Sequence, residues 1–305
     1  MGNWNVKGCM IPIVTPFDDQ EQVDEAALRN LVNYLIDEQA ADAMVPCGTT
    51  GESPTLSHEE HHRVIEIVYE ETAGRVPVIA GTGSNSTAEA VEMTQEAEKL
   101  GVDASLQVAP YYNRPSQEGI YDHFKTIAAA TSLPIILYNI PFRTGRNIEV
   151  DTIVRLAEID NIVGIKAASG NILQANAILE RTRGDKQDFF VYSGEDPVTF
   201  LMLCLGGHGA IAAVAHVIGV EFARMCRLVW DDKLDEAREI HYQVIPTIRA
   251  LFCEPNPAPI KQALNWMGVP VGGLRLPLKE LTEGGKDILR GALVDLGKAS
   301  PEDCK

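Results

Sequence analysis

The stretch LPIILYNIPFRTGRNIEVDTIVRLAEIDNIVGIK, residues 133–166, contains one complete unit of the fold. It starts and ends with a continuously apolar run, at residues 133–139 and 161–166. Runs of this length and composition are typical of parallel strands that are buried on both faces. A longer stretch with helical character separates them. The unit therefore predicts two parallel strands joined by a helical crossover.

The same alternation recurs along most of the chain. Two of the intervening helical patterns carry end signals: Ser57 and Glu60 have the spacing of a capping box, and Gly101 is placed as a C-cap. Eight such units predict a (β/α)8 barrel, an α/β fold that takes about 250 residues. A doubly wound sheet rarely uses eight evenly spaced units. The apolar runs are residues 8–16, 42–48, 76–81, 103–110, 133–139, 161–166, 188–194 and 207–213.

After about Leu228 the pattern is helical only. We therefore expect the barrel to occupy residues 1–226 and a C-terminal helical region to occupy residues 227–305.

The composition indicates a soluble globular protein, with 45% hydrophobic and 23% charged residues. A net charge of −17 argues against a nucleic-acid partner, because phosphate binding requires basic patches. No apolar run approaches the roughly 20 residues of a membrane span, and the first residues lack the apolar core of a signal peptide. The six cysteines are scattered without a C-x-x-C pair, which favours reduced thiols in the cytoplasm over disulfides or a zinc ribbon.

Functional side chains of a barrel lie at the C-terminal ends of its strands. The segments after the predicted strands are rich in hydroxyl, phenol and charged groups. Each residue alone could have a purely structural role, since threonines cap helices and buried tyrosines pack with a satisfied hydroxyl. Their convergence on one rim of the barrel nevertheless favours a functional site. They are Thr49, Thr50 and Glu52 after the second strand, Tyr111 and Tyr112 after the fourth, Tyr138 and Arg143 after the fifth, and Lys166 after the sixth.

Lys166 ends an apolar strand, where a lysine needs either access to water or a partner. One interpretation is a side chain that snorkels or pairs with Glu52 or Glu195. The other is a nucleophile: burial lowers the pKa of a lysine by up to several units, and the neutral amine forms a Schiff base with a carbonyl. This chemistry needs neither a metal nor another cofactor.

The neighbouring groups suit a keto acid. The segment GTTGES, residues 48–53, offers backbone N–H groups and two hydroxyls as an anion cradle, or else is an ordinary glycine-rich turn. Tyr138 suits proton transfer, and Arg143 suits bidentate binding of a carboxylate unless it is simply solvated.

One motif points to different chemistry. His58, Glu59 and His62 match H-E-x-x-H, which places two histidines on one helical face for zinc in some peptidases. No third ligand is evident, and the alternative is a polar first turn of a helix.

Eight runs, in order, cover nearly the whole chain and resemble the pyruvate-dependent class I aldolase superfamily of dihydrodipicolinate synthases and N-acetylneuraminate lyases. The pair Thr49–Thr50 and the pair Tyr111–Tyr112 favour the synthase branch, since neuraminate lyases typically show Ser–Thr at the first pair. The runs are GTTGES, VIAGTGSNSTAEA, PYYNRPSQEGIYDHF, YNIPFRTG, GIKAASGN, YSGED, NPAPIKQAL and LRLPL.

The resemblance implies a (β/α)8 barrel that condenses pyruvate with L-aspartate 4-semialdehyde, the first committed step toward diaminopimelate and lysine. It implies an imine on Lys166 and a proton relay through Tyr138, Thr49 and Tyr112, the last reaching in from a neighbouring subunit of a homotetramer built as a dimer of dimers. Thr50 and the backbone of Ile211 would hold pyruvate, and Arg143 would bind the carboxylate of the second substrate.

The resemblance also implies feedback inhibition by lysine, at a site away from Lys166. The residues that match the family's lysine site are Ser53, Pro54, His58, His61, Asn85, Glu89 and Tyr111.

Three positions depart from the family pattern. Phe142 replaces a small residue before the arginine, Ala167 replaces a common Glu, and His216 replaces a common Asn. Phe142 in particular bears on the choice of the second substrate. The alternatives are therefore a pyruvate aldolase acting on a sugar acid or N-acetylneuraminate, a zinc peptidase and a barrel that only binds keto acids.

Overall fold

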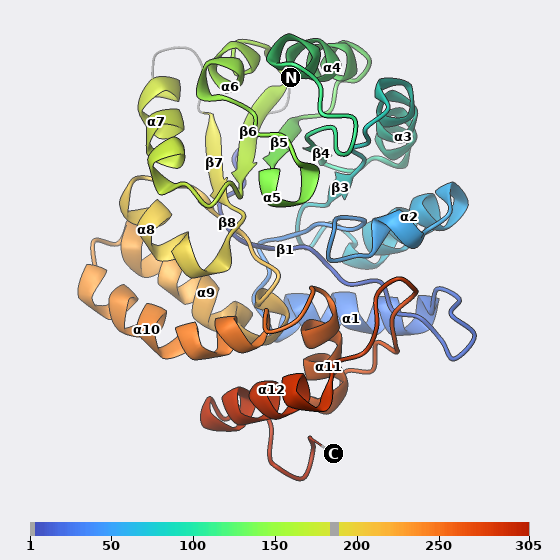
Figure 1. Ribbon diagram of the computed structural model, residues 1–305, viewed down its shortest axis with the longest axis vertical. Helices are drawn as coiled ribbons and strands as arrows, with labels where there is room; N and C mark the ends of the chain where they lie inside the picture. The colour runs from blue at the N-terminus through green and yellow to red at the C-terminus, as the bar shows by residue number, and fades with distance from the viewer. Residues whose placement is uncertain (1–3, 184–188, 305) are drawn as a thin grey trace.

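The computed structural model describes residues 4–183 and 189–304, and it confirms the (β/α)8 barrel with a C-terminal helical extension (Figure 1). Each strand lies in one of the eight predicted runs, although β6 extends one residue further. Asp188, which starts the seventh run, lies outside the described residues. The strands are β1 Gly8–Ile11, β2 Ala43–Met44, β3 Ile79–Gly81, β4 Ala104–Val108, β5 Ile135–Asn139, β6 Ile162–Ala167, β7 Phe190–Ser193 and β8 Gly209–Ile211.

The strands form one closed parallel sheet. Their hydrogen-bonded order is β2-β1-β8-β7-β6-β5-β4-β3. A parallel bridge between Met44 and Val78 joins the two ends of that order and closes the barrel. Closure leaves no open edge and brings the C-terminal ends of all eight strands to one rim.

Helices surround the barrel, and the predicted end signals are present. Ser57 and Glu60 form a reciprocal capping box at the start of α2, and Gly101 ends α3 with a left-handed φ of 94°. The helices and short turns up to residue 230 are α1 Glu25–Asp37, η1 Ser53–Thr55, α2 His58–Thr72, α3 Thr87–Leu100, α4 Gln117–Ala129, α5 Pro141–Thr144, α6 Val150–Leu156, α7 Ile172–Thr182, η2 Asp196–Val198, α8 Thr199–Cys204 and α9 Ala215–Trp230.

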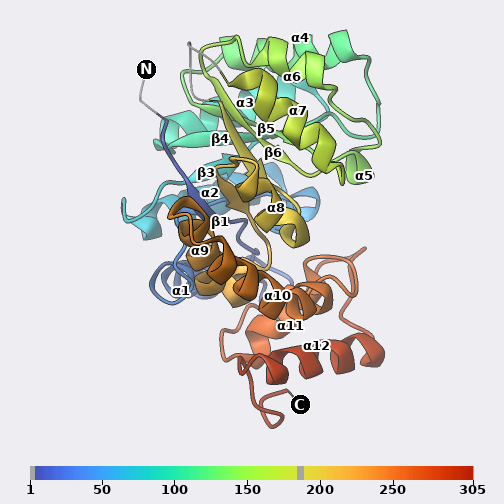
Figure 2. The ribbon, with the colours of Figure 1, turned by 90° about the vertical axis from the view of Figure 1, so that its left-hand side faces the viewer.

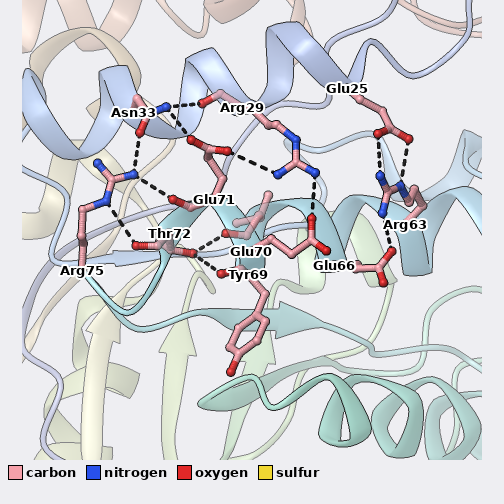
Figure 3. A network of polar contacts seen from close by, with 11 residues as sticks. Glu25, Arg29, Asn33, Arg63, Glu66, Tyr69, Glu70, Glu71, Thr72 and Arg75 are labelled. Carbon is pink, nitrogen blue, oxygen red and sulfur yellow. Dashed lines mark hydrogen bonds and ion pairs between the residues drawn. The ribbon is translucent and has the colours of Figure 1, made fainter.

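Ion pairs link α1 to α2 on the surface (Figure 3). Arg29 of α1 lies 2.7 Å from Glu70 and 3.3 Å from Glu71 of α2. Arg63 of α2 lies 2.6 Å from Glu25 of α1. Exposed pairs of this type contribute about 0–1 kcal/mol each, so apolar packing beneath them dominates.

The C-terminal region consists of α10 Leu234–Ala250, α11 Ala258–Trp266 and α12 Glu283–Asp295. In both views α12 lies at the end of the molecule opposite α4 and α6 (Figures 1 and 2). The predicted boundary between residues 226 and 227 falls inside α9. We therefore propose that α9 belongs to the barrel and that the C-terminal region begins after it. One apolar core contains residues of both parts, including Leu28 and Phe222 of the barrel and Leu264 and Leu289 of the C-terminal helices.

Within residues 4–183 and 189–304, no helix has the length and apolar character needed to cross a bilayer. All six cysteines fall in these described ranges, and each is a free thiol.

Candidate active site

A cavity of about 480 Å³ lies at the C-terminal rim of the barrel. The structure brings together there every residue predicted for catalysis or substrate binding except Tyr112. Residues of the C-terminal region also contribute to its wall. The lining includes Thr49, Thr50, Tyr138, Phe142, Arg143, Lys166, Gly194, Glu195, Asp196, Ile211 and Asn256.

Lys166 lines this cavity. It lies in register with Tyr138 on β5 and with Tyr192 on β7, and only 6% of its surface is exposed. Burial lowers its pKa to about 8; the charge of Asp196 opposes that shift and Arg143 adds to it. Lys166 is therefore not a snorkelling lysine, and a substantial share of its amine is neutral near pH 8.

The stem of Lys166 fits because residue 194 is glycine. A Cβ at Gly194 would lie 2.8 Å from Cγ and 3.0 Å from Cε of Lys166. Such distances are shorter than carbon atoms tolerate. Glycine at this position therefore provides the space that the lysine occupies.

The aromatic ring of Tyr138 lies beside the amine of Lys166. The Lys166 Nζ lies 4.4 Å from the centre of its ring. Burial raises the pKa of Tyr138 to about 12, although Arg143 and a side-chain hydrogen bond with Thr49 both oppose the rise. The phenol is therefore protonated at neutral pH and connected to a threonine hydroxyl, as a proton relay requires.

Thr50 and Ile211, which are predicted to hold pyruvate, both line the cavity. The Thr50 Oγ1 accepts a hydrogen bond of 3.0 Å from Nδ2 of Asn256, which leaves the hydroxyl proton free to donate. Ile211 on β8 is buried and lines the same cavity. Sequence reasoning did not select Asn256, which lies in the matched run NPAPIKQAL but far along the chain from the barrel rim.

Sequence reasoning assigned no role to Asp196, which also lines this cavity. Asp196 is 3% exposed, and its Oδ2 accepts the Val214 N–H at 3.2 Å. The Oδ1 atom has no hydrogen-bond partner among the described residues. Burial raises the pKa of Asp196 to about 7, whereas its backbone donors and Lys166 act to lower it. The signal in the sequence was the acidic end of YSGED after the seventh strand.

Arg143 and Phe142 lie on α5 at the edge of the cavity, and both are exposed. Phe142 is 93% exposed, so its ring extends into solvent at the edge of the cavity. The other two departures from the family pattern lie elsewhere. Ala167 packs in the apolar layer outside the barrel. His216 is buried, and its Nε2 accepts the Val14 N–H at 3.2 Å.

Tyr112 does not reach the cavity in the single chain. Its side chain is 90% exposed, and it lines neither this cavity nor the neighbouring one. A place in the proton relay therefore requires a second subunit, and that role stays a prediction.

A second cavity of about 410 Å³ adjoins the first. Thr49, Tyr138 and Arg143 line both cavities. Asn85 lies at its margin and donates from Nδ2 to the backbone oxygen of Tyr111 at 3.1 Å. The structure thus gathers the predicted lysine-site residues in one place. The walls of the second cavity include Ser53, Pro54, His58, His61, Glu89 and Tyr111.

The polar groups of the second cavity form a small network. The Oε1 atom of Glu89 lies 2.9 Å from Nε2 of His58, and Ser84 donates to its Oε2. Burial lowers the pKa of His61 to about 4, so His61 is neutral. Within this network, Glu89 provides the negative charge.

The H-E-x-x-H motif has no zinc geometry. His58 contacts Glu89, whereas His62 Nδ1 lies 3.9 Å from Glu96. The described part of the chain holds no group of three or more His, Cys, Asp or Glu side chains arranged to bind a metal ion. The zinc-peptidase hypothesis thus has no geometric support.

Similar proteins share this fold over almost their whole length. The model of the dihydrodipicolinate synthetase family matches residues 5–295. The 4-hydroxy-tetrahydrodipicolinate synthase of Moorella thermoacetica is 48% identical over 285 residues, which cover 93% of this chain and 96% of the relative. The synthase of Oceanobacillus iheyensis is 47% identical over 283 residues, which cover 93% of this chain and 95% of the relative.

Two solved structures are similar and hold small molecules. The chloride-inhibited dihydrodipicolinate synthase of Acinetobacter baumannii, complexed with pyruvate, is 43% identical with a TM-score of 0.92 and covers 96% of this chain and 99% of its own. The dihydrodipicolinate synthase of Cyanidioschyzon merolae with lysine bound is 43% identical with a TM-score of 0.93. The match covers 96% of this chain and 99% of that structure's chain.

Proposed function

Because the chain belongs to the dihydrodipicolinate synthetase family, we propose that it condenses pyruvate with L-aspartate 4-semialdehyde to form 4-hydroxy-tetrahydrodipicolinate. It is an enzyme of the lyase class, related to the class I aldolases, and its relatives serve lysine and diaminopimelate biosynthesis. The observation that carries the proposal is a buried lysine, Lys166, whose amine lies in a cavity beside the phenol of Tyr138.

Catalysis begins with the neutral amine of Lys166. The amine adds to the keto carbon of pyruvate, and water leaves to give a protonated imine. Loss of a methyl proton converts the imine to an enamine, whose carbon attacks the aldehyde of the second substrate. The amino group of that substrate then attacks the imine carbon. The ring closes as the carbon–nitrogen bond to Lys166 breaks.

The surrounding groups carry protons and hold charge. Tyr138 and Thr49 move protons to and from the reacting atoms, together with Tyr112 of a neighbouring subunit in a homotetramer. Thr50 and the backbone of Ile211 bind the carboxylate of pyruvate. The carboxylate of Asp196 faces the positive charge of the imine and stabilises it.

Arg143 binds the carboxylate of the semialdehyde at the cavity edge. An alternative is a pyruvate aldolase of the same superfamily with a sugar-acid acceptor, because the exposed ring of Phe142 lines the cavity beside Arg143.

Lysine inhibits the enzyme from the second cavity. Glu89 pairs with the ε-ammonium group, and Asn85 binds the amino-acid end. Support comes from the lysine held by the Cyanidioschyzon merolae relative and from the walls that the two cavities share.

Trapping with borohydride tests the proposal. Incubation with pyruvate and borohydride should add one reduced pyruvate per chain, located on Lys166. Lys261 is an internal control, because burial also lowers its pKa to about 8 but it does not line the cavity. An adduct on Lys261, or none, contradicts the mechanism. Rates with several aldehydes then decide between the semialdehyde and sugar-acid acceptors.

A further inference from the structure

The turn that carries Thr49 and Thr50 has unusual backbone geometry at both ends. Cys47 has a φ of 57° and Glu52 a φ of 55°, so two non-glycine residues lie in the left-handed region. Such conformations persist only where the surrounding structure enforces them, and they cluster at functional sites. The contacts that hold Glu52 therefore bear on the two hydroxyls between these residues.

A buried ion pair holds Glu52. Its Oε1 atom lies 2.6 Å from Nζ of Lys261 on α11, and the side chains are 0% and 2% exposed. The backbone N–H of Arg275 donates to its Oε2 at 3.2 Å. Lys261 also donates to the Gly273 oxygen at 2.6 Å and lies 4.2 Å from the centre of the Phe17 ring. Apart from Phe17, these contacts all come from the C-terminal region.

The same region also contacts the turn directly, through the hydrogen bond from Asn256 to Thr50. A buried carboxylate and a buried ammonium each require their partner, since either one alone is strongly unfavourable. The pair therefore permits one placement of the turn relative to α11.

We propose that Glu52 and Lys261 are positioning residues, whose ion pair fixes the turn of residues 47–52 and so orients the hydroxyls of Thr49 and Thr50 in the cavity. This inference rests on the proposed function. Neither residue touches the substrate. Their effect is on pyruvate binding, because Thr50 belongs to the anion-binding part of the site.

Kinetics of Lys261→Met separate positioning from mere stability. Displacement of the turn raises the KM for pyruvate by about tenfold or more, because small displacements of a binding group are costly. A purely structural role instead lowers the folded fraction, which reduces kcat and leaves KM unchanged. If the single variant unfolds, the KM for pyruvate is measured instead on the double variant Glu52→Gln/Lys261→Met, which leaves no unpaired buried charge.

Lys298→Met is the matched control. Lys298 also forms an ion pair with a glutamate, Glu221, at 2.7 Å, with side chains 19% and 23% exposed, but neither residue lines the cavity. The KM of Lys298→Met for pyruvate should stay within about twofold of wild type, because a partly exposed ion pair contributes little to the stability of the fold.

The outcomes are distinct. A folded Lys261→Met or double variant with unchanged KM overturns the inference. So does unfolding of both variants while Lys298→Met folds, because the pair would then serve the fold as a whole. If the wild-type enzyme itself forms no pyruvate adduct on Lys166, the proposed function fails first, and the inference fails with it.

Discussion

Tyr138 and Lys166 are paired residues on adjacent strands, and the Lys166 amine lies 4.4 Å from the centre of the Tyr138 ring. Burial acts on them in opposite directions, since it lowers the pKa of Lys166 to about 8 and raises that of Tyr138 to about 12. The charged form is disfavoured in both cases. The result is an amine that loses its proton easily beside a phenol that keeps its own.

The rate of adduct formation should rise with pH through about 8. At pH 7.5 a lysine with a pKa of about 8 is about one-quarter neutral, whereas at the ordinary value of 10.5 it would be about one part in a thousand neutral. Initial rates of borohydride trapping with pyruvate from pH 6 to 10 measure the midpoint. Lys166→Arg should form no adduct, because guanidinium stays protonated. A wild-type midpoint near 10 would contradict this account.

Asp196→Asn should move the pH midpoint of borohydride trapping to lower pH. The negative charge of Asp196 raises the pKa of Lys166, so its removal lets the pKa fall below about 8. Asparagine keeps an oxygen for the Val214 N–H. Turnover should nevertheless decrease by about tenfold or more, because the protonated imine loses its counter-charge.

Glu195→Gln is the control for Asp196→Asn. Glu195 lines the same cavity but is not among the groups that shift the pKa of Lys166. Its midpoint should remain close to the wild-type value. A midpoint that stays fixed or moves upward in Asp196→Asn would show that Asp196 does not act on the amine.

The sequence was sufficient to predict the barrel and the centre of its site. Continuous apolar runs mark buried parallel strands, and barrel topology then places Thr49, Tyr138 and Lys166 on one rim. Tyr138 and Lys166 lie near the C-terminal ends of β5 and β6, and Thr49 directly follows the second apolar run, so local pattern and global fold agree about them.

Residues whose placement depends on distant packing were not predictable in the same way. Asn256 and Lys261 lie in the helical C-terminal region, and only tertiary structure shows that they contact Thr50 and Glu52. The sequence alone allows Glu52 as a partner for Lys166, whereas in the structure Glu52 pairs with Lys261. Tyr112 lines neither cavity, and its predicted role requires a neighbouring subunit that a single chain does not contain.

Gly194→Ala should impair imine formation while the protein still folds. The new Cβ would lie within 3.0 Å of Lys166 and 2.9 Å from the Ala168 Cβ. Because the lysine stem is the most adaptable of these neighbours, it should move and misplace the amine, which lowers the trapping rate by about tenfold or more. Gly291→Ala, where nothing lies within 4 Å of the new Cβ, is the control. Equal trapping rates in the two variants would show that the stem adapts without cost.

Mixed oligomers should test the role of Tyr112. Lys166→Ala and Tyr112→Phe are each expected to be nearly inactive. If Tyr112 serves the neighbour's site, a mixed dimer contains one site with both residues intact, and activity returns after subunit exchange. Native mass spectrometry verifies the exchange. Verified exchange without recovered activity would place Tyr112 outside the proton relay.

Glu89→Gln should weaken inhibition by lysine by about tenfold or more and leave turnover nearly unchanged. The carboxylate of Glu89 lies in the second cavity beside His58 and Ser84, where it can pair with an ε-ammonium group. A charge-assisted hydrogen bond contributes about 1.5–3 kcal/mol, so its loss should weaken lysine binding by about tenfold or more. Thr49 and Tyr138 line both cavities, which gives bound lysine a direct route to the proton relay.

The measurement is activity against pyruvate concentration at several fixed lysine concentrations, with calorimetry to measure lysine binding independently. Glu96→Gln is the matched control, because Glu96 lies on the same helix but outside the cavity, and it should keep wild-type inhibition. Allostery requires two sites and a coupling free energy between them. Saturating pyruvate should therefore alter the Kd of lysine by the same factor as lysine alters the Kd of pyruvate. Lysine that binds in the second cavity without that reciprocity would not be an allosteric inhibitor, and a wild-type enzyme unaffected by millimolar lysine would refute the site altogether.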